Sequence, residues 1–224
     1  SSGAVALGRR VAEFSGSSDA LAEKQARAAM GQIQLAERWR VALSAHSIPA
    51  AQILLTPDDT EERQRYLNAR DTLDALASIG AVAIINENDT VATDELRYGD
   101  NDRLAARVAS MIGADLLILL SDVDGIYDND PTMCDDANHI PLASEIDDTL
   151  WSYAGESRSS VGTGGMRSKL MAASIANTSG IPVILASGRD DLPVSAINGS
   201  ARCTLFLSQA SRRSARRQWI AASL

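Results

Sequence analysis

The chain has 224 residues and a mass of 23.7 kDa, with 45% hydrophobic and 22% charged residues. These values are typical of a folded globular protein and exclude global disorder. The 21 basic and 29 acidic side chains give a net charge of −8, which argues against a surface that wraps nucleic acid. A chain of this length buries a sizeable core, so it needs neither a metal nor disulfide cross-links for stability.

The two cysteines, Cys134 and Cys203, are far apart and show no Cys-x-x-Cys spacing. They can build neither a disulfide framework nor a zinc site on their own, so we expect a reducing, cytoplasmic setting. A membrane span needs about 18 consecutive apolar residues, whereas the longest strong run here is Leu116–Leu120. The first residues also lack the basic region and apolar core of a secretion signal.

Helical patterns alternate with short apolar runs, which predicts βα units around a mainly parallel sheet, the α/β class. The first long element expected is a helix over Leu21–Ser44, with Ala29, Ile33, Ala36 and Leu43 recurring on its buried side. The further expected elements are, in chain order, a strand at 52–56, a helix from 57 that stops at Gly80, a strand at 82–85, a helix at about 103–113, a strand at 116–120, a helix from 162–165 to about 179, and strands at 183–186 and 203–207.

No internal repeat or low-complexity linker interrupts this pattern, so residues 1–210 are expected to form one domain and residues 211–224 a basic tail or linker. Four arginines stand in this tail before Trp219: Arg212, Arg213, Arg216 and Arg217. Because the chain is acidic overall, a solvated helix face or linker is favoured over an RNA site. We expect neither a nucleic-acid nor a membrane partner.

Polar and glycine-rich residues gather directly after the apolar strands, where open parallel sheets bind their ligands. The segment Gly162–Lys169 leads into a helix, so its backbone N–H groups and the helix N-terminus favour a bound phosphate. Lys169 stands one turn into that helix and can reach back toward such a phosphate. A Walker A loop is excluded because Lys169 follows a serine, and a dinucleotide fingerprint because Arg167 stands where it needs glycine. A flexible loop before a capped helix remains the alternative.

Two acidic and amide-rich clusters, 86–89 and 99–102, follow the strand at 82–85. Carboxylates and amides at a strand end can hold an ammonium group, a carboxylate or hydrated Mg²⁺. For a single acidic residue, turn formation or helix capping is the simpler explanation, but the two clusters together favour a site. A further acidic cluster at 124–130 lacks the ligand spacing of an EF-hand.

The third candidate place is Ser121–Tyr127, after the most apolar strand. Its Asp-Gly pair predicts a tight turn, and a contact with ribose or adenine is expected if the glycine loop holds phosphates. The chain has two histidines, His46 and His139, and lacks the Gly-x-Ser-x-Gly elbow of serine hydrolases. We therefore do not expect a Ser–His–Asp triad.

Taken together, these segments resemble the amino acid kinase family, and within it the branch that phosphorylates glutamate. The segments that carry the resemblance are 2–4, 66–73, 85–93, 99–102, 119–127 and 162–169. The pair Asn-Glu-Asn-Asp and Gly-Asp-Asn-Asp is specific to the glutamate branch, whereas the glycine–lysine loop is shared more loosely across the family. The resemblance implies a three-layer αβα sandwich with a mainly parallel sheet.

The resemblance also implies an activity: ATP-dependent phosphorylation of the side-chain carboxylate of L-glutamate to glutamyl 5-phosphate, the first step of proline biosynthesis, with ATP and Mg²⁺. Lys169 would stabilise the transferring phosphoryl group, and Asp102 would orient the cationic groups around it. The implied substrate-binding residues are Ser2, Asn86, Asp89 and Asn101, and the implied ATP-binding residues are Ser121, Asp122, Thr163, Gly164, Gly165, Met166, Arg167, Ser168 and Lys169. A homo-oligomer and feedback inhibition by proline are implied in the same way.

Family members usually carry a Lys-x-Gly strand ahead of the segment that begins at Ser1, and often a PUA domain after the kinase domain. We therefore expect these residues to be a fragment that is poorly soluble and nearly inactive alone. Two alternatives stay open: a related amino acid kinase with another acid or phosphate acceptor, and a non-catalytic module that senses an amino acid or nucleotide. The missing strand lysine favours the module, whereas Lys169 and Asp102 oppose it.

Overall fold

The computed structural model describes residues 1–11, 21–91, 101–155, 165–189, 191–199 and 201–208. The chain divides into two compact units, Ser1–Asn101 and Asp102–Leu224, which are described separately below. The prediction of a single domain over 1–210 stays a prediction, and the basic tail lies outside the described residues. None of the described helices is both long and apolar enough to cross a membrane.

The first unit is built around one parallel pair of strands. Its elements are α1 (Ala4–Arg9), α2 (Leu21–Ser44), β1 (Ala50–Leu55), α3 (Pro57–Glu61), α4 (Arg63–Ser78) and β2 (Val82–Glu87), followed by the first residue of α5 (Asn101–Ile112). β1 and β2 pair in parallel from Ala50 opposite Val82 to Leu55 opposite Glu87. The chain crosses from β1 to β2 through α3 and α4, which confirms the βα unit predicted here.

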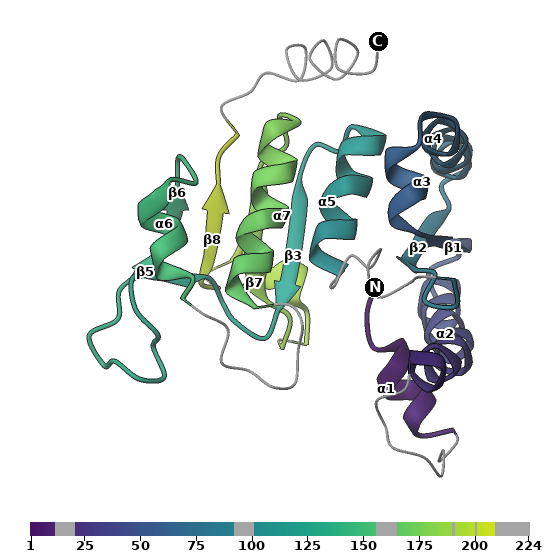
Figure 1. The fold of residues 1–224 in the computed structure, drawn as a ribbon, viewed down its shortest axis with the longest axis horizontal. Coiled ribbons are helices and arrows are strands. Elements are labelled where there is room, and N and C mark those ends of the chain that lie inside the picture. Colours follow the sequence, from purple (N-terminus) through teal and green to yellow (C-terminus); the bar gives the residue numbers. More distant parts are fainter. Residues whose placement is uncertain (12–20, 92–100, 156–164, 190, 200, 209–224) are drawn as a thin grey trace. The chain divides into compact units, whose positions relative to one another are not determined.

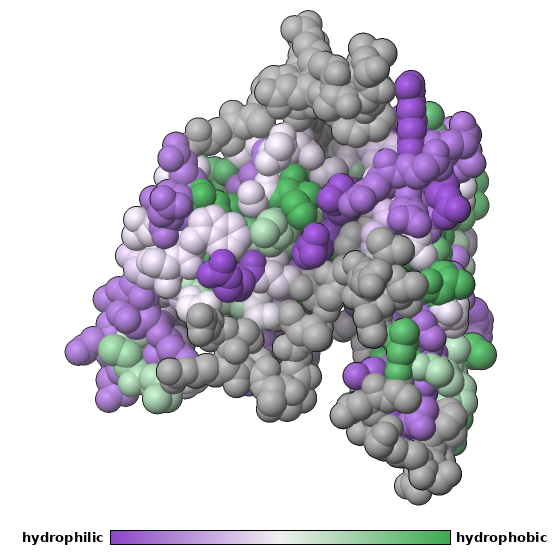
Figure 2. All heavy atoms as spheres, viewed as in Figure 1, coloured by the Kyte–Doolittle hydropathy of each residue, from purple (hydrophilic) through white to green (hydrophobic). Residues whose placement is uncertain are grey.

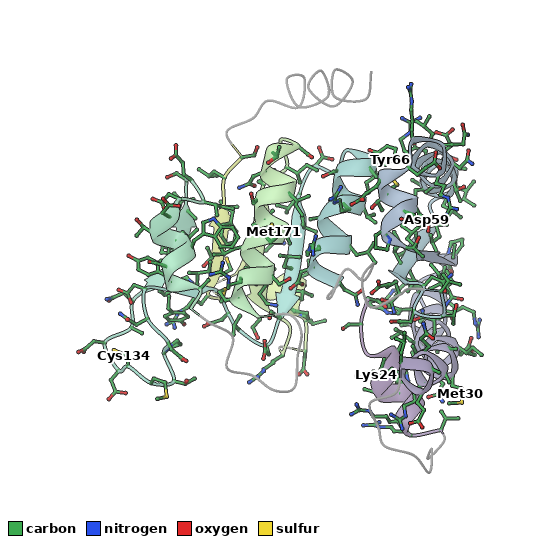
Figure 3. All side chains as sticks on the ribbon, in the orientation of Figure 1. Lys24, Met30, Asp59, Tyr66, Cys134 and Met171 are labelled. Atoms are coloured by element: carbon green, nitrogen blue, oxygen red, sulfur yellow. The ribbon has the colours of Figure 1, made fainter. Side chains whose placement is uncertain are left out.

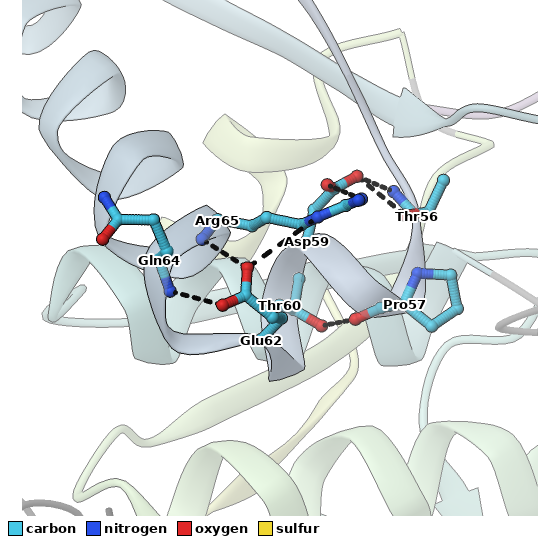
Figure 4. A network of polar contacts seen from close by, with 7 residues as sticks. All are labelled: Thr56, Pro57, Asp59, Thr60, Glu62, Gln64 and Arg65. Atoms are coloured by element: carbon cyan, nitrogen blue, oxygen red, sulfur yellow. Dashed lines mark hydrogen bonds and ion pairs between the residues drawn. The ribbon is translucent and has the colours of Figure 1, made fainter.

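The helix expected from residue 57 is in fact two helices, because the backbone of Glu62 is extended (φ −77°, ψ 124°). Figure 4 shows the polar contacts at this break. Asp59 Oδ2 accepts from the Thr56 N–H at 2.7 Å and so caps α3, while the Glu62 carboxylate accepts from the N–H groups of Gln64 and Arg65 at 3.0 and 3.1 Å. The carboxylate of Glu62 thus starts α4 at the place where α3 ends.

α2 packs against α1 through small residues, and the buried side predicted for α2 is wrong at Ile33, whereas Ala29, Ala36 and Leu43 are half-buried. The buried residues of α2 are Arg27, Ala28, Gly31, Gln32 and Leu35. Ile33, which was expected inside, is 73% exposed. A Cβ added at Gly31 would stand 1.8 Å from the Ala4 carbonyl oxygen, and one added at Gly8 would stand 1.8 Å from that of Arg27. The two backbones approach so closely that glycine and alanine, rather than large apolar side chains, occupy the contact.

The second unit contains a four-stranded sheet in the order β3-β7-β8-β6. After Asn101, its elements are the rest of α5, β3 (Leu117–Ser121), β4 (Ile126–Tyr127), β5 (His139–Ile140), β6 (Leu142–Ala143), α6 (Asp148–Tyr153), α7 (Met166–Thr178), β7 (Val183–Ser187), α8 (Pro193–Asn198) and β8 (Cys203–Phe206). β3 pairs with β7 in parallel and β8 with β6 in parallel, while β7 and β8 are antiparallel. The short strands β4 and β5 form a separate antiparallel pair, which the sequence patterns did not predict.

The core of the second unit joins α5 and α7 to this sheet. Leu119, Val183, Leu185 and Phe206 come from the strands and are at most 4% exposed, and Leu170 of α7 is fully buried. Figure 1 shows α7 running along the sheet. Each unit also keeps apolar side chains at its surface, visible as green areas in Figure 2, as is usual for globular proteins. The helices and mostly parallel strands of both units confirm the predicted α/β class.

The close α1–α2 contact gives a stability prediction. Gly31→Ala in the complete protein should lower the free energy of unfolding by about 3 kcal/mol or more, because its Cβ meets backbone atoms that cannot move aside. Gly80→Ala is the control: Gly80 has a φ of 70° and no atom within 4 Å of an added Cβ, so only the left-handed backbone costs about 1–2 kcal/mol. Urea denaturation measures both. Equal losses would contradict the described contact.

Candidate functional site

The two predicted catalytic residues form an ion pair in the second unit. The Lys169 ammonium donates to Asp102 Oδ2 at 2.9 Å, and its side chain is 9% exposed against 21% for Asp102. Asp102 lies in the first turn of α5, and Lys169 lies near the start of α7, which begins at Met166. The pair therefore brings the N-terminal ends of two helices together, and both ends favour negative charge.

The start of α7 is shaped for an anion. Gly165 is the N-cap of this helix, in extended conformation (φ −69°, ψ 178°), and Met166 begins the first turn. The first N–H groups of a helix have no acceptor within the helix, so they are available to a ligand. Arg167 is exposed, with its guanidinium carbon 5.6 Å from the ring centre of Trp151. Thr163 and Gly164, also predicted to contact ATP, lie outside the described residues.

Of the predicted nucleotide contacts, Ser121 is the last residue of β3 and Asp122 follows it. The Ser121 hydroxyl donates to Asp122 Oδ1 at 3.0 Å, and the Ser121 carbonyl accepts from the N–H of Gly188 at 2.7 Å. Asp122 is exposed and Ser121 half-buried. Both residues thus stand at the carboxyl end of the parallel pair β3–β7, the place where open α/β sheets bind their ligands.

The turn after Asp122 is held by one buried hydroxyl. Thr204 of β8 is fully buried, and its Oγ1 accepts from the N–H of Ile126 at 2.8 Å and donates to the carbonyl of Ile140 at 2.6 Å. A Cβ added at Gly125 would lie 2.7 Å from this oxygen and 2.4 Å from His139 Nε2. The hydroxyl therefore connects β8 to both β4 and β5, and glycine is required where the turn passes.

A polar cluster beside this turn was missed by the sequence analysis. The Tyr127 hydroxyl donates to Asp124 Oδ1 at 3.0 Å and accepts from Arg202 Nη1 at 2.7 Å, and the His139 ring lies edge-on to Tyr127 at 5.3 Å between centroids. Burial lowers the pKa of His139; the nearby Arg202 charge acts in the same sense, and Asp124 opposes both. Arg202 stands alone in its stretch of sequence, so no motif could have pointed to it.

The predicted substrate residues lie in the first unit, at the end of β2. The backbone nitrogen of Ser1 donates to the Ile85 carbonyl at 2.7 Å, and the Asn101 amide donates to the Ser1 carbonyl. Asn101 therefore lies beside the segment that carries Ser2, which is exposed. The structure thus brings the first residues of the chain, the end of β2 and the first residue of α5 together.

Asn86 is 4% exposed and is the most deeply buried of the predicted substrate residues. Its Nδ2 donates to Gln32 Oε1 on α2 at 2.7 Å. Asp89 is half-buried and lies in the turn that follows β2. The N–H of the preceding residue, Asn88, donates to the carbonyl of Leu55 at the end of β1. Gly99 and Asp100 of the second acidic cluster lie outside the described residues.

The sequence matches a known protein family and several curated relatives. Residues 1–187 match the model of the amino acid kinase family. The chain belongs to this family. It is 53% identical to glutamate 5-kinase 1 of Rhizobium meliloti, 54% to glutamate 5-kinase of Rhizobium etli and 48% to that of Gluconobacter oxydans, in each case over the whole chain and 57–59% of the relative. The chain thus spans less than two thirds of the length of these curated relatives.

Several solved structures share the fold at low sequence identity. The chain superposes on aspartokinase III of E. coli with a TM-score of 0.58 at 18% identity, covering 92% of this chain and 45% of that one. For an isopentenyl phosphate kinase the TM-score is 0.56 at 15% identity, with 91% and 77% covered. For the UMP kinase of Ureaplasma parvum it is 0.54 at 13%, with 80% and 68% covered. These similarities confirm the predicted α/β sandwich.

The lowered pKa of His139 gives a pH prediction. The folded state holds fewer protons on His139 than the unfolded state, so stability falls as the pH drops through the ordinary histidine pKa near ~6.5. His139→Gln should therefore lose less stability than the wild type between pH 7.5 and 5.5, measured as the midpoint of urea denaturation. His46→Gln, which replaces the other, exposed histidine, is the control. A parallel fall in wild type and His139→Gln would contradict the environment described for this ring.

Proposed function

We propose that the protein transfers the γ-phosphoryl group of ATP to the side-chain carboxylate of L-glutamate, in the cytoplasm, on the route to proline. The observation that carries this proposal is the ion pair between Lys169, near the start of α7, and Asp102, in the first turn of α5. Asp102 directly follows Asn101 in the sequence. The relatives named glutamate 5-kinase, at 48–54% identity, support the choice of glutamate. The two free cysteines agree with a reducing compartment; Figure 3 labels Cys134, in the loop between β4 and β5.

The chemistry fits the residues present. A glutamate side chain is already ionised at neutral pH, so its oxygen can attack the γ-phosphorus without a general base. A bond forms from this oxygen to phosphorus, the bond from phosphorus to the β–γ bridging oxygen breaks, and ADP leaves. Alignment and charge neutralisation then carry the catalysis. Lys169 supplies the positive charge, and Asp102, at 2.9 Å, fixes where that charge stands.

The phosphate groups would meet the first turn of α7, including Gly165, Met166, Arg167 and Ser168, together with Thr163 and Gly164. The nucleoside would lie against Ser121 and Asp122 at the end of β3. In the described ranges, no three His, Cys, Asp or Glu side chains gather as a metal site. We propose that Mg²⁺ binds together with the phosphates of ATP, as part of the substrate.

Glutamate would be held by Ser2, Asn86, Asp89 and Asn101. Amide groups and carboxylates can pair with both the α-ammonium and the α-carboxylate of an amino acid. Asn101 and Asp102 are consecutive, so their Cα atoms are about 3.8 Å apart. One residue at the start of α5 therefore serves the acceptor and the next serves the phosphoryl group. A homo-oligomer and inhibition by proline are further parts of the proposal, and they rest on the resemblance to the family.

Lys169→Met tests the assigned catalytic charge. In the complete protein it should lower kcat by roughly 10²-fold or more while glutamate binding changes little, because the ammonium acts mainly in the transition state. Lys24→Met is the matched control, since Lys24 is the other lysine of the chain and lies on α2 (Figure 3). The readout is ADP release with glutamate, aspartate, N-acetylglutamate and carbamate as acceptors. An unchanged kcat in Lys169→Met would contradict the catalytic role assigned to Lys169. If the wild type released ADP only with an acceptor other than glutamate, the protein would be a different kinase.

Asp89→Asn and Asn101→Ala test the glutamate site. We expect a large rise in the glutamate KM with the ATP KM little altered, because a buried polar group left without its partner costs about 1–3 kcal/mol of binding energy. Asn68→Ala, on the exposed side of α4, is the control. Should the ATP KM rise instead of the glutamate KM, the two sites have been assigned the wrong way round.

A further inference from the structure

Gln32 and Asn86 form a buried pair of amides. They stand 54 positions apart, on α2 and β2, with Asn86 Nδ2 donating to Gln32 Oε1 at 2.7 Å. Gln32 is 6% exposed and Asn86 4%. Ile84 is buried on the same face of β2, since side chains alternate along a strand. The hydrogen bond therefore places Gln32 over the face of β2 that carries Asn86.

The second amide atom of Gln32 is unsatisfied. Within the part of the chain that the structure describes, its Nε2 is buried and has no hydrogen-bond partner. Burying an amide donor without a partner is unfavourable, so packing alone would favour an apolar side chain of similar size at this position. The presence of an amide points to a task for its oxygen, which is bonded to Asn86.

The pair presents a defined pattern of donors and acceptors. With Nδ2 of Asn86 bonded to Gln32, the oxygen that remains on Asn86 is an acceptor, and the Nε2 that remains on Gln32 is a donor. Turning both amides over reverses the bond and exchanges these two atoms, but still leaves one donor and one acceptor. A free amino acid offers the complementary pair: an ammonium that donates and a carboxylate that accepts. An N-acylated amino acid has no ammonium.

The pair also borders the segments assigned to glutamate. The Ile85 carbonyl, next to Asn86 on β2, accepts from the backbone nitrogen of Ser1, and the Ser1 carbonyl in turn accepts from Asn101. Three separate parts of the first unit thus converge on the last residues of β2. Asn86, one member of the buried amide pair, is the next residue of β2 after Ile85.

We propose that Gln32 is a positioning residue that sets the acceptor class: it holds the amide of Asn86 so that Asn86 accepts a hydrogen bond from the α-ammonium of a free amino acid. This inference rests on the proposed function, which places Asn86 in the glutamate site. Gln32 acts through Asn86, and its test must separate this role from support of the fold.

Gln32→Met in the complete protein is the first variant. The glutamate KM should rise about tenfold, which is the loss of one well-placed hydrogen bond, while kcat and the ATP KM change less than twofold. The preference for glutamate over N-acetylglutamate should fall by a similar factor. Gln64→Met is the matched control, because Gln64 Nε2 also bonds an asparagine oxygen, that of Asn68 at 3.2 Å, but on an exposed surface of α4. Calorimetric titration with glutamate gives the same comparison without turnover.

A double-mutant cycle with Asn86→Ala shows whether Gln32 acts through Asn86. The double variant should have the glutamate KM of Asn86→Ala alone. The melting temperature of Gln32→Met should stay within about 4 °C of the wild type, the shift that one lost hydrogen bond gives in a chain of this size. A larger fall would show that the position supports the fold and would overturn the proposal, as would an unchanged glutamate KM or additive effects in the cycle. If the wild type phosphorylates no glutamate, the proposed function itself fails, whatever Gln32 does.

Discussion

The ion pair between Lys169 and Asp102 is the interaction on which the rest of the site depends. Its ammonium and carboxylate oxygen are 2.9 Å apart, and the two side chains are 9% and 21% exposed. Breaking a largely buried ion pair costs more stability than breaking one at the surface, where water screens both charges. The pair therefore fixes the first turns of α5 and α7 in one arrangement. In the proposed reaction, this contact would position the charge of Lys169 before a phosphate binds, so little reorganisation would be needed as charge develops.

Strand ends and helix starts supply the remaining groups. Ser121 is the last residue of β3 and Asp122 follows it, while Asn86 lies near the end of β2. Strands position such groups well because their backbone is locked by ladder hydrogen bonds up to the last pair, here Ser121 with Ser187. Thr204 extends this rigidity beyond the sheet by bonding to both strands of the small β4–β5 pair. Ser121 and Asn86 thus stand on strands, which hold a side chain more precisely than a loop does.

Sequence patterns predicted the features that are set by residues near one another in the chain, such as helices and strands. The helix over Leu21–Ser44, the strands near residues 52, 82, 117, 183 and 203, and the pairing of Lys169 with Asp102 in one place all follow from periodicity and from resemblance to the family. The failures depend on contacts between distant residues. Ile33 lies outside because the glycines of α1 and α2 let the backbones touch, and periodicity cannot report such a contact. Arg202 and Gln32 were missed because their partners, Tyr127 and Asn86, are 75 and 54 positions away.

The two halves of the proposed reaction are joined by a covalent constraint. Asn101 bonds the Ser1 backbone in the first unit, and Asp102, the next residue, bonds Lys169 in the second. A change in the path of the chain at the start of α5 must therefore affect both the acceptor side and the phosphoryl side. In the proposed reaction, the start of α5 carries one residue for each substrate, and the proposed role of the amides of Asn86 and Gln32 concerns the acceptor alone.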